Sequence, residues 1–123
     1  MKHRILIVDD EPNIVMSLEF ILAKSGFETA VARDGDEALE QVERFRPHLV
    51  LLDVMMPRRD GYEVCQTMRA AGWRDVKIVM LTAKGRDTEV AKGLAVGADA
   101  YVTKPFSTRE LVQQVRTLLE EDG

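Results

Sequence analysis

Short runs of aliphatic residues recur along this chain, and their recurrence constrains the fold more than any other feature of the sequence. The runs cover residues 5–8, 27–32, 49–52, 78–81 and 100–102. Several are continuously apolar instead of alternating with polar positions, which is typical of strands that are covered on both faces. The pattern therefore predicts a sheet buried between two layers of other structure.

Segments of helical periodicity separate these runs. Between Pro12 and Gly26, apolar residues recur at the spacing of one helix face. Further helices are expected over about residues 36–45, after Asp60-Gly61, over about residues 88–97, and from Ser107, whose spacing to Glu110 is that of a capping box. Each expected strand is thus followed by an expected helix.

Five such strand–helix units in 123 residues predict one domain, residues 1–123, of the α/β class. Right-handed crossovers place helices on both faces of a parallel sheet, so we expect a doubly wound (βα)5 domain. The expected strand order is 2-1-3-4-5, as in flavodoxin-like folds.

Composition excludes several classes of protein. The formal net charge is −4, from 17 basic and 21 acidic residues, which disfavours binding to nucleic acid through phosphates. Cys65 is the single cysteine, so an internal disulfide is excluded and a reducing cytoplasm is expected. No apolar run reaches membrane-spanning length, and the N-terminus lacks the pattern of a signal peptide.

Polar residues follow four of the five expected strands. Asp9 and Asp10 come after the first, Asp53 after the third, Thr82 after the fourth, and Lys104 after the fifth. In open parallel sheets, ligands bind beyond the carboxyl ends of the strands, where the strand order reverses. We therefore expect three carboxylates to converge on one crevice, and such a cluster requires a cation.

Mg²⁺ is the expected cation because it prefers oxygen ligands in octahedral geometry. Asp10 and Asp53 are expected to bind it directly, Asp9 through water, and Met55 through its backbone carbonyl. The remaining groups are suited to a phosphoryl group beside the metal.

Lys104 offers a positive charge to one phosphoryl oxygen and Thr82 offers a hydroxyl to another, while the small Ala83 leaves its backbone N–H open. Asp53 is then the in-line nucleophile and forms an aspartyl phosphate.

These residues together resemble the signature of response regulator receiver domains, which share the fold of chemotaxis regulators. The matching motifs are Asp9-Asp10, Asp53, Thr82-Ala83 and Lys104-Pro105, with Tyr101 three residues before the lysine. The resemblance extends from residue 4 to about residue 119. It implies phosphotransfer to Asp53 from a histidine kinase or phosphotransferase of a two-component system, or from a small donor such as acetyl phosphate.

The resemblance also implies how the signal leaves the domain. Thr82 and Tyr101 are expected to switch the surface formed by the fourth helix, fifth strand and fifth helix toward an output partner. It further implies a cis peptide before Pro105. The protein is then a phosphoacceptor with slow self-dephosphorylation and not an enzyme, and either a stand-alone regulator or the receiver of a longer protein.

The resemblance assigns contacts with partners as well. The kinase is expected at Asn13, Ile14 and Ser17 and at the Pro105-Phe106 loop. Related receivers dimerise through charged pairs, for which Lys92, Asp99, Glu110 and Arg116 are available here. This chain has Ala100 and Gln114 where those relatives commonly carry an acid and an arginine, so we expect a monomer or a weak dimer strengthened by phosphorylation.

Met55 and Lys84 occupy the positions that flank the approach of hydrolytic water in such receivers, two residues after Asp53 and two after Thr82. Neither side chain can orient or deprotonate that water while the lysine is charged. We therefore expect a long-lived phosphoryl group.

The sequence disfavours several other functions that share features with this one. A flavodoxin-like cofactor binder would carry Ser, Thr or Gly in its first loop, whereas this chain has Asp-Asp-Glu. An aspartyl phosphatase would need a second acid at position 55, and a P-loop nucleotidase would need its glycine-rich motif, which the chain lacks. The remaining alternative is a pseudo-receiver that acts as an interaction module without phosphorylation.

Overall fold

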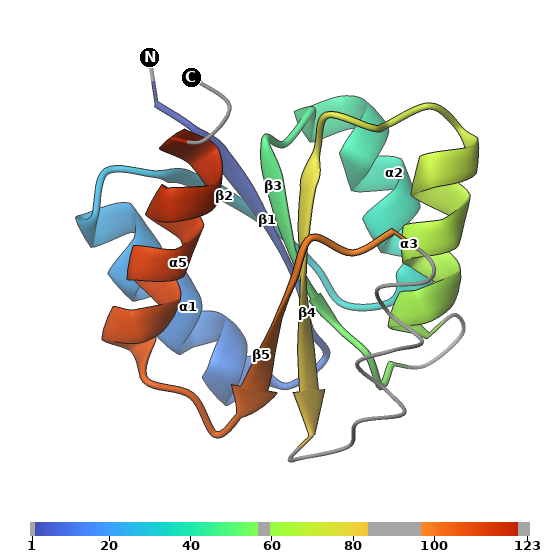
Figure 1. Ribbon diagram of the computed structural model, residues 1–123. Helices are drawn as coiled ribbons and strands as arrows, with labels where there is room; N and C mark the ends of the chain where they lie inside the picture. Colours follow the sequence, from blue (N-terminus) through green and yellow to red (C-terminus); the bar gives the residue numbers. More distant parts are fainter. Residues whose placement is uncertain (1, 57–59, 84–96, 121–123) are drawn as a thin grey trace.

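The computed structural model describes residues 2–56, 60–83 and 97–120. Five parallel strands form one sheet in the order β2-β1-β3-β4-β5, as Figure 1 shows. The strands are β1 (Arg4–Val8), β2 (Glu28–Ala32), β3 (Leu49–Asp53), β4 (Lys77–Ala83) and β5 (Ala100–Lys104). The predicted fold class and strand order are both confirmed.

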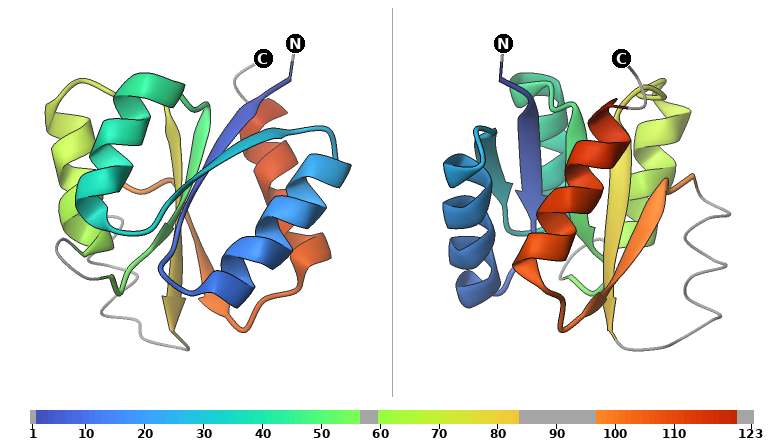
Figure 2. Two further views of the ribbon diagram at one scale, coloured as in Figure 1. Left: turned by 180° about the vertical axis from the view of Figure 1, so that it is seen from behind. Right: turned by 60° about the vertical axis from the view of Figure 1, so that its left-hand side comes forward.

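Helices cover both faces of the sheet. Those in the described part of the chain are α1 (Pro12–Lys24), α2 (Gly35–Phe45), α3 (Gly61–Ala70) and α5 (Thr108–Glu120). Helices α1 and α5 lie on one face, and α2 and α3 lie on the other (Figures 1 and 2). The helix predicted over about residues 88–97 falls outside the described residues, except for Gly97.

The continuously apolar strands supply two separate cores. In β1, Ile5 and Ile7 pack with residues of α1 and α5, whereas Leu6 and Val8 pack with residues of α2 and α3. All four side chains have no exposed surface. Because successive side chains of a strand point to opposite faces, each residue of the run fills one of the two cores. Full burial of such a side chain contributes roughly 1.5–3 kcal/mol.

Polar side chains define where the helices begin. Asp34 precedes α2 and accepts a hydrogen bond from the backbone N–H of Glu37 at 2.8 Å, and Asp60 precedes α3 and accepts one from Glu63 at 2.9 Å. Ser107 accepts from the N–H of Glu110 at 3.3 Å, as the capping-box spacing predicted. Each of these bonds satisfies a backbone donor that the helix itself leaves open.

The side chain of Arg69, on α3, joins three segments at the amino ends of β4 and β5. Its guanidinium donates to the carbonyls of Trp73 at 2.6 Å, Val76 at 2.7 Å and Gly97 at 3.0 Å. It also forms an ion pair of 2.9 Å with Asp99. Helix α3 is therefore fixed to the sheet at the edge where β4 and β5 start.

Within the described residues, every helix is too short or too polar to cross a membrane. This agrees with the absence of long apolar runs in the sequence.

The thiol of Cys65, on α3, is fully buried. Burial raises the pKa of Cys65 to about 11, and Asp99 adds to this shift while Arg69 opposes it. At pH 8, about one thiol in a thousand is then the reactive thiolate. We predict that a thiol reagent such as Ellman's reagent will not label the folded protein and will label it once urea unfolds the chain. Rapid labelling of the folded protein would contradict the described packing of α3.

Candidate functional site

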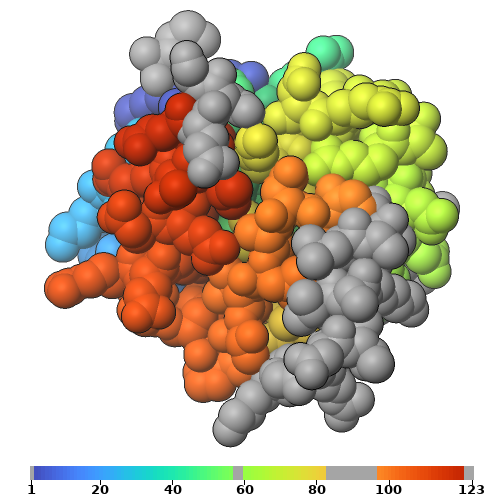
Figure 3. Space-filling model, viewed as in Figure 1, coloured from blue at the N-terminus to red at the C-terminus, as the bar shows by residue number. Residues whose placement is uncertain are grey.

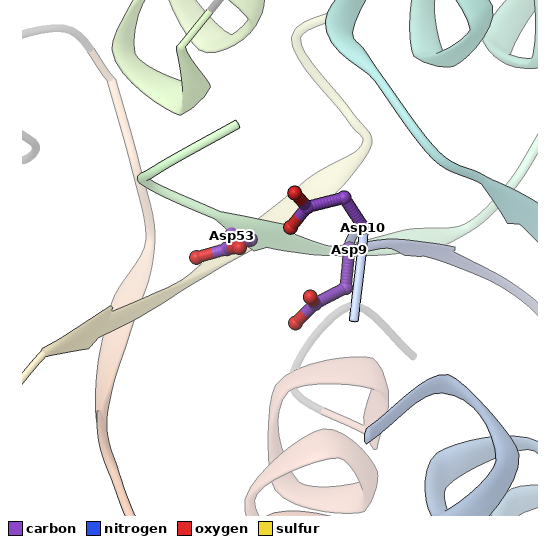
Figure 4. A group of neighbouring side chains, drawn as sticks. All are labelled: Asp9, Asp10 and Asp53. Atoms are coloured by element: carbon purple, nitrogen blue, oxygen red, sulfur yellow. The ribbon is translucent and has the colours of Figure 1, made fainter. Parts of the chain in front are cut away.

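The polar residues predicted to converge do so at the carboxyl edge of the sheet. Asp9 and Asp10 follow β1, and Asp53 is the last residue of the neighbouring strand β3 (Figure 4). One carboxylate oxygen from each of the three lies within 4.8 Å of the others, so the group could hold a metal ion. The crevice between β1 and β3 is the point where the strand order reverses, as expected for a ligand site.

Lys104, the last residue of β5, supplies the positive charge of the site. Its Nζ atom lies 3.1 Å from Oδ2 of Asp9 and 3.4 Å from Oδ1 of Asp53. Burial lowers the pKa of Lys104, but attraction to Asp53 and Asp9 outweighs this effect, so the pKa is raised overall. The lysine therefore stays protonated and balances part of the charge of the aspartates.

The three aspartates differ in burial and in their partners. Asp9 has no exposed surface, and its Oδ1 accepts a hydrogen bond from the N–H of Glu11 at 3.0 Å while its Oδ2 contacts Lys104. Asp53 is 6% exposed and accepts a weaker bond, of 3.3 Å, from the N–H of Met55. Asp10 is exposed. Both oxygens of Asp9 are thus engaged by the protein, whereas Asp10 faces the opening of the site.

A cavity of about 210 Å³ lies above these groups. It is lined by Asp9, Asp10, Glu11, Asp53, Met55 and Lys104. The side chain of Met55 is 70% exposed at its margin. Since the share of one water in the liquid is about 30 Å³, the cavity has room for an ion with its waters and a small oxyanion.

Thr82 lies in β4 and is buried, and Tyr101 lies in β5, half-buried against the core under α2 and α3. The peptide between Lys104 and Pro105 is cis, as predicted. Lys84 falls outside the described residues, and so does Lys92.

Gly61 is a residue whose place in the site the sequence did not indicate. The sequence assigned it only to the start of a helix. In the structure its N–H donates to the carbonyl of Val54 at 2.9 Å, so the first turn of α3 lies against the backbone that follows Asp53. The residue type alone did not signal this contact, because it depends on how closely the start of α3 approaches the end of β3.

A second cavity opens beside the first, between α1 and the start of α5. Its volume is about 530 Å³, and its lining is Glu11, Asn13, Ile14, Ser17, Lys104, Pro105, Phe106 and Thr108. Two large apolar side chains of α1, Met16 and Phe20, are 67% and 69% exposed. The residues predicted to contact the kinase line this one groove, which shares Glu11 and Lys104 with the cavity at Asp53.

Comparison with known proteins identifies a family. A family model described as the response regulator receiver domain matches residues 5–116. The DNA-binding response regulator MtrA of Mycolicibacterium smegmatis is 48% identical over 122 residues, 99% of this chain and 53% of that protein. The alkaline phosphatase synthesis transcriptional regulatory protein PhoP of Bacillus subtilis is 45% identical over 119 residues, 97% of this chain and 49% of that protein. The chain spans about half the length of these relatives.

Solved structures agree with the sequence comparisons. A putative response regulator from Chloroflexus aurantiacus superposes with a TM-score of 0.92 at 36% identity, covering 98% of this chain and 99% of that one. The receiver domain of the Francisella response regulator 1452 superposes with a TM-score of 0.93 at 30% identity, covering 99% and 100%.

The charge of Asp53 makes the site sensitive to pH. Burial raises the pKa of Asp53 from 3.8 to about 6, Asp9 adds to the shift, and Lys104 and the N–H of Met55 oppose it. The folded state then holds this proton more tightly than the unfolded state does. The protonated carboxyl of Asp53 therefore stabilises the folded state relative to the unfolded state below about pH 4, and this stabilisation is lost as the pH rises through about 6.

We predict that a ¹³C titration of the Asp53 carboxyl in metal-free protein has its midpoint near pH 6. Urea unfolding in a chelator should show stability falling between pH 4 and 6, and Asp53→Asn should remove that part of the fall. A midpoint near pH 4 would show that the carboxyl is better solvated than the structure indicates.

Proposed function

Because this chain belongs to the response regulator receiver domain family, we propose that it accepts a phosphoryl group on Asp53 in a Mg²⁺-dependent reaction in the cytoplasm. The observation that carries the proposal is the surroundings of Asp53. Its buried carboxylate lies with those of Asp9 and Asp10 in one cluster and 3.4 Å from the ammonium group of Lys104. The pairing of a carboxylate nucleophile with a cation site and a fixed positive charge suits phosphoryl transfer.

The chemistry of the donors fits Mg²⁺. The cluster offers carboxylate oxygens alone, which are ligands for hard cations. We assign Asp10 and Asp53 as direct ligands, with the carbonyl of Met55, and Asp9 as a ligand through water because both its oxygens already have protein partners. When bound, the ion supplies charge neutralisation for the incoming phosphoryl oxygens.

The transfer itself requires little from the protein beyond position and charge. An oxygen of Asp53 forms a bond to phosphorus as the bond from phosphorus to the donor's imidazole nitrogen, or to the acetate oxygen of acetyl phosphate, breaks. Even without a metal ion, a pKa of about 6 leaves roughly nine-tenths of Asp53 ionised at pH 7, and a bound cation would favour the ionised form further. The ammonium group of Lys104 balances the negative charge of one phosphoryl oxygen, and the hydroxyl of Thr82 donates a hydrogen bond to another.

We propose that the groove beside the site receives the phosphodonor protein, a histidine kinase or phosphotransferase. The groove adjoins Lys104 and contains the apolar side chains of Ile14 and Phe106. Met16 and Phe20, which do not line the groove, are further exposed apolar side chains of α1. A helical partner that carries a phosphohistidine could cover this surface while its imidazole reaches Asp53.

The signal then passes to the face formed by β5 and α5, which lie side by side on the surface in Figure 3. Tyr101, in β5, is the residue that we expect to respond to a contact between Thr82 and the phosphoryl group. The two relatives, which are about twice as long, are named a DNA-binding regulator and a transcriptional regulatory protein. We propose that the output of this receiver is a DNA-binding domain of the same protein.

We propose that the unphosphorylated domain is a monomer or a weak dimer. Two charges that a dimer could use are already engaged within the chain. Asp99 pairs with Arg69 at 2.9 Å, and Arg116 donates to the carbonyl of Ser25 at 3.0 Å and lies over the ring of Phe27.

Phosphorylation of Asp53 can be tested directly. We predict that acetyl phosphate with Mg²⁺ labels the wild-type protein, that a chelator abolishes labelling, and that Asp53→Asn is not labelled. Asp36→Asn, which alters an exposed acid of α2, serves as the control and should be labelled as wild type. Intact-mass spectrometry measures each result. An unlabelled wild-type protein would favour the pseudo-receiver, and labelled Asp53→Asn would disprove the assigned acceptor.

The lifetime of the phosphoryl group is a separate prediction. Met55 lies at the margin of the cavity and offers no hydrogen bond that could orient water. We predict that Met55→Asn combined with Lys84→Glu speeds loss of phosphate by about tenfold, because a base can then assist the attacking water. Decay of the phosphorylated protein measures this. Met16→Asn changes an exposed methionine outside this cavity and should leave decay unchanged; equal decay in the double variant would contradict the prediction.

A further inference from the structure

The first residue of α3, Gly61, lies directly against the backbone of the acceptor strand. A methyl group on its Cα would lie 2.5 Å from the carbonyl oxygen of Asp53, 3.0 Å from Cα of Val54 and 3.1 Å from the carbonyl carbon of Asp53. A distance of 2.5 Å is shorter than real contacts of a side-chain carbon, and all three neighbours are backbone atoms that cannot rotate away. With the backbone in this arrangement, the position therefore has no room for any side chain.

The need for glycine here is one of space and not of backbone conformation. Gly26, Gly72 and Gly97 have positive φ angles, which side chains disfavour, and Gly61 does not share this property. By helix propensity alone, alanine would be the better residue in α3. A harmful effect of alanine at this position would consequently report the contact with Asp53.

Neither partner in this contact can easily move aside. Strand β3 is buried along its whole length and paired on both sides, with β1 and β4. Helix α3 is held by buried Tyr62, Val64, Cys65 and Met68, and at its other end by the hydrogen bonds of Arg69. A methyl group would thus press on the peptide between Asp53 and Val54, which it would touch directly, and strain the backbone from Asp53 to Met55.

That segment carries the chemistry of the site. It holds the carboxylate of Asp53, which Lys104 contacts at 3.4 Å, and the backbone of Met55, whose N–H donates to Asp53 at 3.3 Å. We infer that Gly61 is a positioning residue, which lets α3 pack onto the Asp53–Val54 peptide and so holds Asp53 in line with Asp9 and Asp10. This inference rests on the proposed function, because it concerns the same acceptor.

The test compares two glycine-to-alanine variants of one helix. Gly61 begins α3, and Gly72 follows its end with a φ of 98° and nothing within 4 Å of an added methyl group. Gly72→Ala should lower the melting temperature through backbone strain and leave the site unchanged. Gly61→Ala should weaken Mg²⁺ binding, measured by calorimetry, and slow labelling by acetyl phosphate, each by about tenfold or more, since small displacements of reacting groups have effects of up to about 100-fold.

Each outcome decides between the inference and its alternatives. Equal Mg²⁺ affinity and labelling in wild type and Gly61→Ala would overturn the inference, and so would a Gly72→Ala variant that loses as much. If Gly61→Ala does not fold, the measurements are repeated in the cold with trimethylamine N-oxide, which favours the folded state. Failure to fold even then would make Gly61 a requirement of the whole domain and overturn the specific role. An unlabelled wild-type protein would instead refute the proposed function.

Discussion

One ammonium group, the Nζ of Lys104, lies between two buried carboxylates that would otherwise repel each other. Its contacts with Asp9 and Asp53, at 3.1 and 3.4 Å, join the end of β5 to the ends of the two central strands. In a partly buried setting such charges interact several times more strongly than in water. With Asp10 included, however, one positive charge faces three carboxylates, and this excess of acidic groups would be relieved by a cation.

Sequence reasoning succeeded where the pattern of one strand, or the position of a residue at the end of a strand, determines where that residue lies. The continuously apolar runs indicated a sheet covered on both faces, and the polar residues at the strand ends indicated Asp9, Asp53 and Lys104 as neighbours. It was less accurate for the exact residues at which the strands end. The structure continues β4 through Thr82 and Ala83 and β5 through Lys104, because polar side chains do not interrupt the backbone pairing of these strands.

The roles of Asp99 and Arg116 could not be predicted because they arise from contacts between distant segments. The role of Gly61 could not be predicted because it depends on how closely α3 approaches the end of β3. Asp99 was expected among the charges available to a dimer, yet it pairs with Arg69 and accepts a hydrogen bond from the N–H of Ile78 at 2.8 Å. Whether a charge is available to a partner depends on such contacts. Spacing along the chain carries no information about them.

Arg69 also holds the segment that carries the single tryptophan of the chain, Trp73. Trp73 is attached through its carbonyl to Arg69, and Arg46 lies over its indole ring at 5.2 Å. This places the indole before the start of β4, at the opposite edge of the sheet from the aspartates. Its emission is therefore a reporter of whether α2, α3 and the sheet remain packed together, whereas ion binding among the aspartates calls for a chromophore introduced at the other edge.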